Sequence, residues 1–123
     1  MTNSLTISEE AGVRFLEGPP DSGLLRKSDD VNLIIENSFS TKVRSALLYA
    51  SNMTPAFFDL SSGEAGAILQ KLRQYRVRVA LVCPPGKVRF STRFGELVAE
   101  ENRLNHFRFF ESAETARGWL VRG

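Results

Sequence analysis

Two short, mainly apolar runs constrain the fold of this chain most. Residues 46–50 read Ala-Leu-Leu-Tyr-Ala, and residues 77–83 read Val-Arg-Val-Ala-Leu-Val-Cys. The first run has no polar alternation, which is typical of a strand buried on both faces, as in a parallel sheet covered by helices. The second run is rich in β-branched residues and also predicts a strand. Between the runs, Ile68, Leu69, Leu72 and Tyr75 recur at helical spacing. The pattern therefore predicts two neighbouring parallel strands joined by a helical crossover.

The flanking segments extend this alternation on both sides. Residues 5–7 and 13–16 alternate around a turn at Glu10-Ala11-Gly12, which predicts an N-terminal hairpin. A helix capped by Ser28, with Asp29 and Asp30 in its first turn, should run to about Thr41. Its apolar face is predicted to hold the following residues: Val31, Ile34, Ile35 and Phe39.

The C-terminal third predicts a helix, a strand and a helix. Ser91 is the expected cap of the first helix, residues 107–110 form the strand, and Ser112 caps the last helix. Expected inward positions are Phe94, Leu97, Val98, Ala116, Trp119 and Leu120, and the expected polar side of the first helix holds Glu96, Glu100 and Glu101. The whole chain, residues 1–123, is then one α/β domain in the order β-β-α-β-α-β-α-β-α. Its mixed sheet has a mainly parallel centre flanked by helices.

Composition narrows the functional classes. A chain of 123 residues can bury a single core without disulfide or metal staples, and the lone Cys83 suits a reducing compartment. The sequence has no membrane-length apolar run and no signal-peptide layout at its start, so we expect a cytoplasmic protein without membrane contact. Cys83 and His106 are the only thiol and imidazole, too few for a zinc site. We therefore expect no metal and no cofactor.

The charge is unevenly distributed. Residues 71–93 carry seven basic groups and no acid, although the net charge is only +2. Such a segment is either a solvated surface or a contact for an acidic partner, an anionic ligand or nucleic acid. We rank nucleic acid behind a protein partner and a small anion.

The segment from Thr54 to Glu64 is the strongest candidate site. Thr54-Pro55 predicts a helical turn through Phe57-Phe58, and Ser61-Ser62-Gly63-Glu64 matches a capping box with Ser61 as the cap. The residues expected to contact a partner or accept a phosphate are Ser62, Ser61, Thr54, Phe57, Phe58 and Asp59. The residues of an alternative anion site are Ser61, Ser62, Gly63, Lys87, Arg89 and Arg93. A third interpretation is that both serines serve only the helix end.

Motifs for catalysis are absent from the sequence. It contains neither a P-loop nor a dinucleotide-binding fingerprint, and its adjacent glutamates point different ways on a helix or strand. A reaction through Cys83, with His106 as a base, is arithmetically possible, but nothing in the sequence brings the two together. We therefore expect a protein that is not an enzyme.

The central segment resembles a known family. The run Asn52-Met53-Thr54-Pro55-Ala56-Phe57-Phe58-Asp59-Leu60, followed by Gly63, Gly66, residues 68–71 and residues 75–77, resembles a small uncharacterised bacterial family catalogued as domain of unknown function 4180. This family implies a fold but no activity.

A more distant resemblance is to STAS domains, which are found in anti-sigma-factor antagonists. In those domains an Asp-Ser-Ser-Gly sequence starts a helix after a central strand, and a partner kinase phosphorylates the serine before the glycine. Ser62 and Gly63 take those two places, whereas Leu60 stands where the acid belongs and Asp59 lies one position early. The resemblance implies a regulatory, protein-binding module switched at Ser62, with an unidentified protein partner. A homodimer is a further possibility.

Overall fold

The computed structural model describes residues 5–19, 23–25, 28–59, 62–84, 86 and 92–122. Five strands form one sheet in the order β1-β2-β3-β4-β5, in which β1 is antiparallel to β2 and the other neighbours are parallel. Their bounds are β1 Thr6–Glu10, β2 Val13–Glu17, β3 Ser45–Tyr49, β4 Arg78–Val82 and β5 Phe107–Phe110. The predicted α/β class and the mixed sheet with a mainly parallel centre are confirmed.

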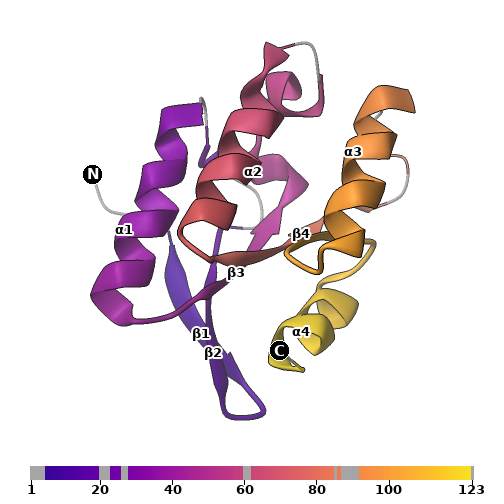
Figure 1. The fold of residues 1–123 in the computed structure, drawn as a ribbon. Helices are drawn as coiled ribbons and strands as arrows, with labels where there is room; N and C mark the ends of the chain where they lie inside the picture. The colour runs from indigo at the N-terminus through magenta and orange to yellow at the C-terminus, as the bar shows by residue number, and fades with distance from the viewer. Residues whose placement is uncertain are drawn as a thin grey trace.

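Three helices cover one face of the sheet and one covers the other (Figure 1). The first group is α1 (Val31–Thr41), α2 (Glu64–Gln74) and α3 (Thr92–Arg103), and the single helix is α4 (Ala113–Val121). Three 3₁₀ turns complete the described elements: η1 Ser28–Asp30, η2 Ala50–Asn52 and η3 Pro55–Phe58. The element order matches the one predicted from sequence.

Strands β3 and β4 are buried on both faces, as the unbroken apolar run predicted for β3. Alternate residues of β3 contact opposite layers: Ala46 and Leu48 face α1–α3, whereas Leu47 faces α4. Trp119 and Leu120 close the α4 side of the core. Pairing with a parallel neighbour on each side gives these strands their backbone hydrogen bonds without water.

The N-terminal hairpin turns at the predicted place. Ala11 and Gly12 have φ values of 53° and 80°, the positive values that a two-residue turn with the right twist requires. β1 pairs on one side only and is largely exposed, with Ile7 partly open to solvent. The hairpin therefore ends the sheet at one edge.

The structure corrects the predicted faces of two helices. Phe39 is 58% exposed, and the inward stripe of α1 continues through Ser38, whose hydroxyl donates to the Val43 carbonyl at 2.6 Å. In α3, Glu101 is only 3% exposed and pairs with Arg73 at 2.9 Å, although we expected it on the polar side. Both polar residues lie seven positions after an inward residue, Val31 or Phe94, so helical geometry turns them inward.

The predicted cap of the first helix also needs correction. Ser28 opens the 3₁₀ turn η1, and Asp30 is the cap residue of α1 without a side-chain capping bond. Ser91 lies outside the described residues. The Ser112 cap is confirmed, because its hydroxyl accepts a hydrogen bond from the Thr115 amide at 3.3 Å. In the described part of the chain, no helix is both long and apolar enough to cross a membrane.

Candidate functional site

Asn52 organises the loop that carries the candidate site. Its side chain is fully buried, accepts from the Tyr49 amide at 2.7 Å and donates to the Pro19 carbonyl at 2.7 Å. Gly18 packs so closely that an added Cβ would lie 2.5 Å from the Asn52 Oδ1 atom. The carboxyl ends of β2 and β3 are thus joined through one amide side chain.

The turn after this loop begins as predicted, with Thr54 before Pro55 at the first position of η3. Thr54 makes no side-chain capping bond there. Phe57 and Phe58 are buried, and each ring centroid lies 5.8 Å from that of Phe94. The expectation that these two rings contact a partner is wrong, because they belong to the core and anchor the loop from beneath.

Ser62 is exposed and ties this segment together. Its Oγ atom lies 2.5 Å from the Ala56 carbonyl oxygen and 2.8 Å from the Asp59 carbonyl oxygen, so its proton is donated to this pair. The same atom accepts from the Glu64 amide at 3.2 Å, and the Ser62 amide donates to Asp59. One hydroxyl therefore connects the end of η3 with the start of α2.

The predicted capping box does not begin α2. The residue at the cap is Gly63, with φ at 80°, and the helix starts at Glu64, whereas Ser61 lies outside the described residues. A left-handed φ is one that glycine adopts without steric cost, which explains why the chain can turn into the helix there. Within the described residues, the Glu64 Oε1 atom is buried and has no hydrogen-bond partner.

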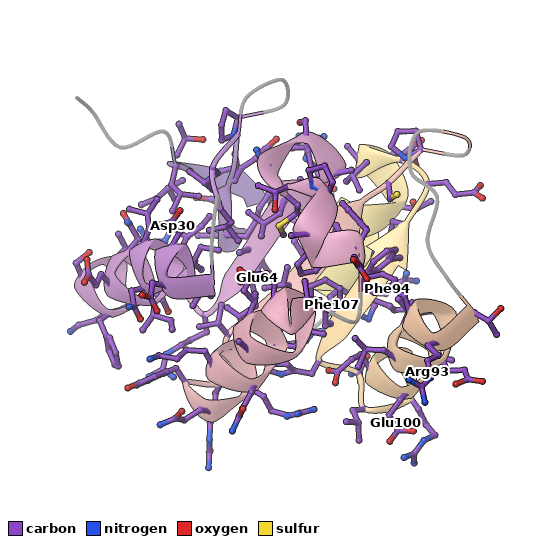
Figure 2. All side chains as sticks on the ribbon, turned by 90° about the horizontal axis from the view of Figure 1, so that it is seen from above. Asp30, Glu64, Arg93, Phe94, Glu100 and Phe107 are labelled. Carbon is purple, nitrogen blue, oxygen red and sulfur yellow. The ribbon has the colours of Figure 1, made fainter. Side chains whose placement is uncertain are left out.

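The alternative anion site is not assembled by the described residues. Ser61, Lys87 and Arg89 lie outside them, and Arg93 extends from α3, apart from Glu64 at the start of α2 (Figure 2). The Ser62 hydroxyl is already engaged with backbone groups. The first turn of α2 also carries the Glu64 carboxylate, which would repel an anion.

Cys83 and His106 do not form a pair. Cys83 follows β4 and its amide donates to the Phe110 carbonyl, whereas His106 precedes β5, so they flank opposite ends of paired strands. A separation of about five residues along a strand corresponds to about 16 Å. Burial raises the pKa of the Cys83 thiol, which makes it a poorer nucleophile. Among the described residues no cluster of three or more metal-ligating side chains exists.

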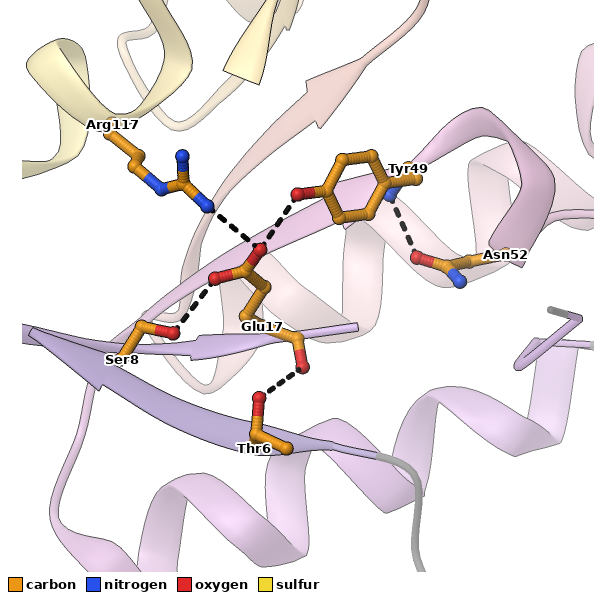
Figure 3. Close-up of polar contacts among 6 residues, drawn as sticks. All are labelled: Thr6, Ser8, Glu17, Tyr49, Asn52 and Arg117. Atoms are coloured by element: carbon orange, nitrogen blue, oxygen red, sulfur yellow. Dashed lines mark hydrogen bonds and ion pairs between the residues drawn. The ribbon is translucent and has the colours of Figure 1, made fainter. Parts of the chain in front are cut away.

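The structure reveals a polar cluster that the sequence did not indicate (Figure 3). The Glu17 carboxylate, at the end of β2, is only 12% exposed. Its Oε2 atom accepts from the Tyr49 hydroxyl at 2.7 Å and from Arg117 on α4 at 3.0 Å, and its Oε1 atom accepts from Ser8 at 2.8 Å. Strand alternation from Phe15 places Glu17 on the α4 face, which is the sequence signal that would have found it.

The hydrogen-bond acceptors of this cluster are occupied, and the cluster holds α4 against the sheet. Burial, the hydrogen bond to Glu17 and the charge of Glu17 raise the pKa of Tyr49 to about 12, and Arg117 opposes the shift. Both carboxylate oxygens of Glu17 have donors. We interpret the cluster as a structural clamp between the hairpin, β3 and α4.

The five-stranded mixed sheet with helices on both faces defines an α/β domain. A family model described as a domain of unknown function, DUF4180, matches residues 10–120, so the chain belongs to this family. The family resemblance drawn from residues 52–77 is thereby confirmed. Neither the curated proteins nor the solved structures contain a match to this chain.

Proposed function

We propose that this domain is a cytoplasmic, non-enzymatic, STAS-like regulatory module that binds a protein partner and is switched by phosphorylation of Ser62. The observation that supports the proposal is the exposed Ser62 hydroxyl, which connects η3 to the start of α2. It lies after the strand β3 and before a helix, the position at which STAS domains carry their modified serine. The reaction belongs to the partner kinase, and this chain supplies the acceptor.

A phosphate on Ser62 would change both charge and local structure. The ester no longer has a hydroxyl proton, so the bonds to the Ala56 and Asp59 carbonyls would be lost. The phosphate adds about −1.5 to −2 charge beside the acids Asp59 and Glu64, while the amides of the helix N-terminus attract it. The polar surface around Thr54, Asp59 and Ser62 would therefore rearrange.

The buried side chains of the segment before Ser62 limit this rearrangement. Phe57 and Phe58 remain held in the aromatic cluster, and Asn52 holds the preceding turn. Among the described residues, the partner surface then comprises Thr54, Asp59 and Ser62, without the two rings. Charge rather than apolar area would distinguish its two states.

The direct test is intact-mass analysis and peptide mapping of protein purified from its native host. A single added phosphate on Ser62 is the expected result. Hydrogen exchange then compares Ser62→Asp with Ser40→Asp, an equal charge change at another exposed serine. Faster exchange at the amides of residues 56–64 in Ser62→Asp alone supports the switch. Unmodified Ser62 in host protein, together with equal exchange in both variants, refutes it.

The anion-binding alternative makes a different prediction. An inorganic phosphate titration should raise the melting temperature of the unmodified protein if residues 61–63 bind an anion. The switch predicts no such rise, because the Ser62 hydroxyl and the Glu64 carboxylate occupy that end of the helix.

A further inference from the structure

A second candidate surface lies at the opposite end of α2, where α1 and α2 both finish. Phe39 is 58% exposed and its ring meets Tyr75 edge to face, with the centroids 5.8 Å apart. Lys42, Arg44 and Arg76 adjoin this pair in the chain or through the backbone. We call these five residues the aromatic–basic surface.

The three cations of this surface come from two connections, Lys42 and Arg44 from the one between α1 and β3 and Arg76 from the one between α2 and β4. Lys42 ends α1 with φ at 61°, and Arg76 follows α2 with φ at 59°. Arg44 precedes β3 and donates to the Tyr75 carbonyl at 3.4 Å, which brings it to the aromatic pair. All three side chains are exposed, and none forms an ion pair with a described residue.

The structure also shows which basic residues of this region are already engaged. Arg73 pairs with the buried Glu101, and the Arg78 guanidinium carbon lies 4.0 Å from the centroid of the Trp119 ring on the α4 face. Figure 2 shows side chains that end in nitrogen around the C-terminal half of α2. Among the described residues, the aromatic–basic surface therefore combines Arg76 of the basic run with Lys42 and Arg44, which lie outside that run.

Helix electrostatics explains only part of this arrangement. A cation at a helix C-terminus is favourable, which accounts for Lys42 and Arg76. It also accounts for the bond from Arg44 to the Tyr75 carbonyl at the end of α2, but not for the exposure of Phe39. In addition, Lys42 and Arg76 occupy left-handed positions at which glycine is the usual residue.

We propose that the aromatic–basic surface binds a short single-stranded segment of nucleic acid. A base would stack on the exposed part of the Phe39 ring, while Lys42, Arg44 and Arg76 would contact neighbouring phosphates. A single exposed ring beside exposed cations suits the stacking of one base next to contacted phosphates. The other large exposed hydrophobic residues in the described part of the chain, Ile7 and Leu104, belong to other elements. This inference is independent of the Ser62 switch.

The test is fluorescence anisotropy with a labelled oligonucleotide of about twelve thymidines. With about three phosphate contacts, the slope of log K against log salt is about −2, so raising salt from roughly 50 to 200 mM should weaken binding about twentyfold. Arg44→Glu and Phe39→Ala should each weaken binding by about fivefold or more. Arg93→Glu, an equal charge change at the far end of α3, should retain nearly full affinity once circular dichroism shows that every variant is folded.

Three results would overturn the proposal. One is the absence of salt-sensitive binding by the unmodified protein. Another is an equal loss of affinity in Arg93→Glu and Arg44→Glu, which would indicate attraction by net charge alone. The third is displacement by a polyglutamate peptide at equal charge, with Phe39→Ala binding the oligonucleotide normally, which would assign the surface to an acidic protein segment.

Discussion

Tyr49→Phe tests whether the Glu17 cluster stabilises the fold. The substitution removes only the hydroxyl that donates to Glu17 at 2.7 Å. A hydrogen bond to a charged group contributes about 1.5–3 kcal/mol, and the remaining Arg117 bond to the same oxygen and the partial exposure of Tyr49 reduce this to about 1–2 kcal/mol. For a domain of this size the melting temperature should fall by roughly 4–8 °C.

The matched control is Tyr75→Phe, because the chain has only two tyrosines. Tyr75 contacts Phe39 through its ring, which this variant retains, so its melting temperature should stay close to that of the unmodified protein. Tyr75→Phe also leaves Tyr49 as the only tyrosine whose ionisation absorbance can be followed. The midpoint in the folded protein should lie at about 12 rather than at the ordinary pKa of 10.0.

The pH dependence follows from the sign of this shift. The folded pKa is raised, so the contribution of the protonated hydroxyl is complete below pH 10 and is lost as the pH rises through about 12. The stability difference between the unmodified protein and Tyr49→Phe should shrink over that window. Equal melting temperatures for the two tyrosine variants, or a Tyr49 midpoint near 10 with native circular dichroism, would refute the reasoning.

Three further predictions concern buried contacts. Gly18→Ala should destabilise the fold by about 1–3 kcal/mol in urea unfolding, because its Cβ would lie 2.5 Å from Asn52 Oδ1. The control Gly66→Ala should be neutral or stabilising, because the space around that position is open. Arg73→Ala should cost about 2–3 kcal/mol, since it leaves the buried Glu101 without its ion pair. Arg103→Ala should leave the stability nearly unchanged, because Arg103 and its partner Glu100 are both exposed. Burial lowers the pKa of His106 below 6.5, because the folded state disfavours the charged imidazolium. The melting temperature should therefore fall as the pH drops below 6.5, and His106→Gln should flatten this dependence.

The sheet was predictable because its central strands carry a strong signal. Ala46, Leu47 and Leu48 are all fully buried, so every position of that run had to be apolar. The parallel direction followed from the helix pattern between the runs, and the turn at Ala11-Gly12 followed from a glycine that permits positive φ.

The candidate site was less predictable because its geometry depends on contacts between distant segments. The Ser62 hydroxyl bonds carbonyls that no helical or strand period places near it. Glu17, Tyr49 and Arg117 meet only because α4 folds back over β2 and β3. The inward positions of Ser38 and Glu101 were unpredictable for the same reason. Each side chain is buried because a group outside its helix, the Val43 carbonyl or Arg73, pairs with it.

The two proposed surfaces can succeed or fail separately because α2 keeps them apart. Its 11 residues span about 16 Å, roughly twice the Debye length at physiological salt. This helix is held against the core by four buried residues, Ala65, Ile68, Leu69 and Leu72. We therefore expect that a rearrangement at Ser62 does not displace Arg76. A phosphate at one end would therefore alter the local partner surface while leaving the charge of the aromatic–basic surface nearly unchanged. The protein partner and the single-stranded nucleic acid should therefore bind the same molecule without measurable coupling between their affinities.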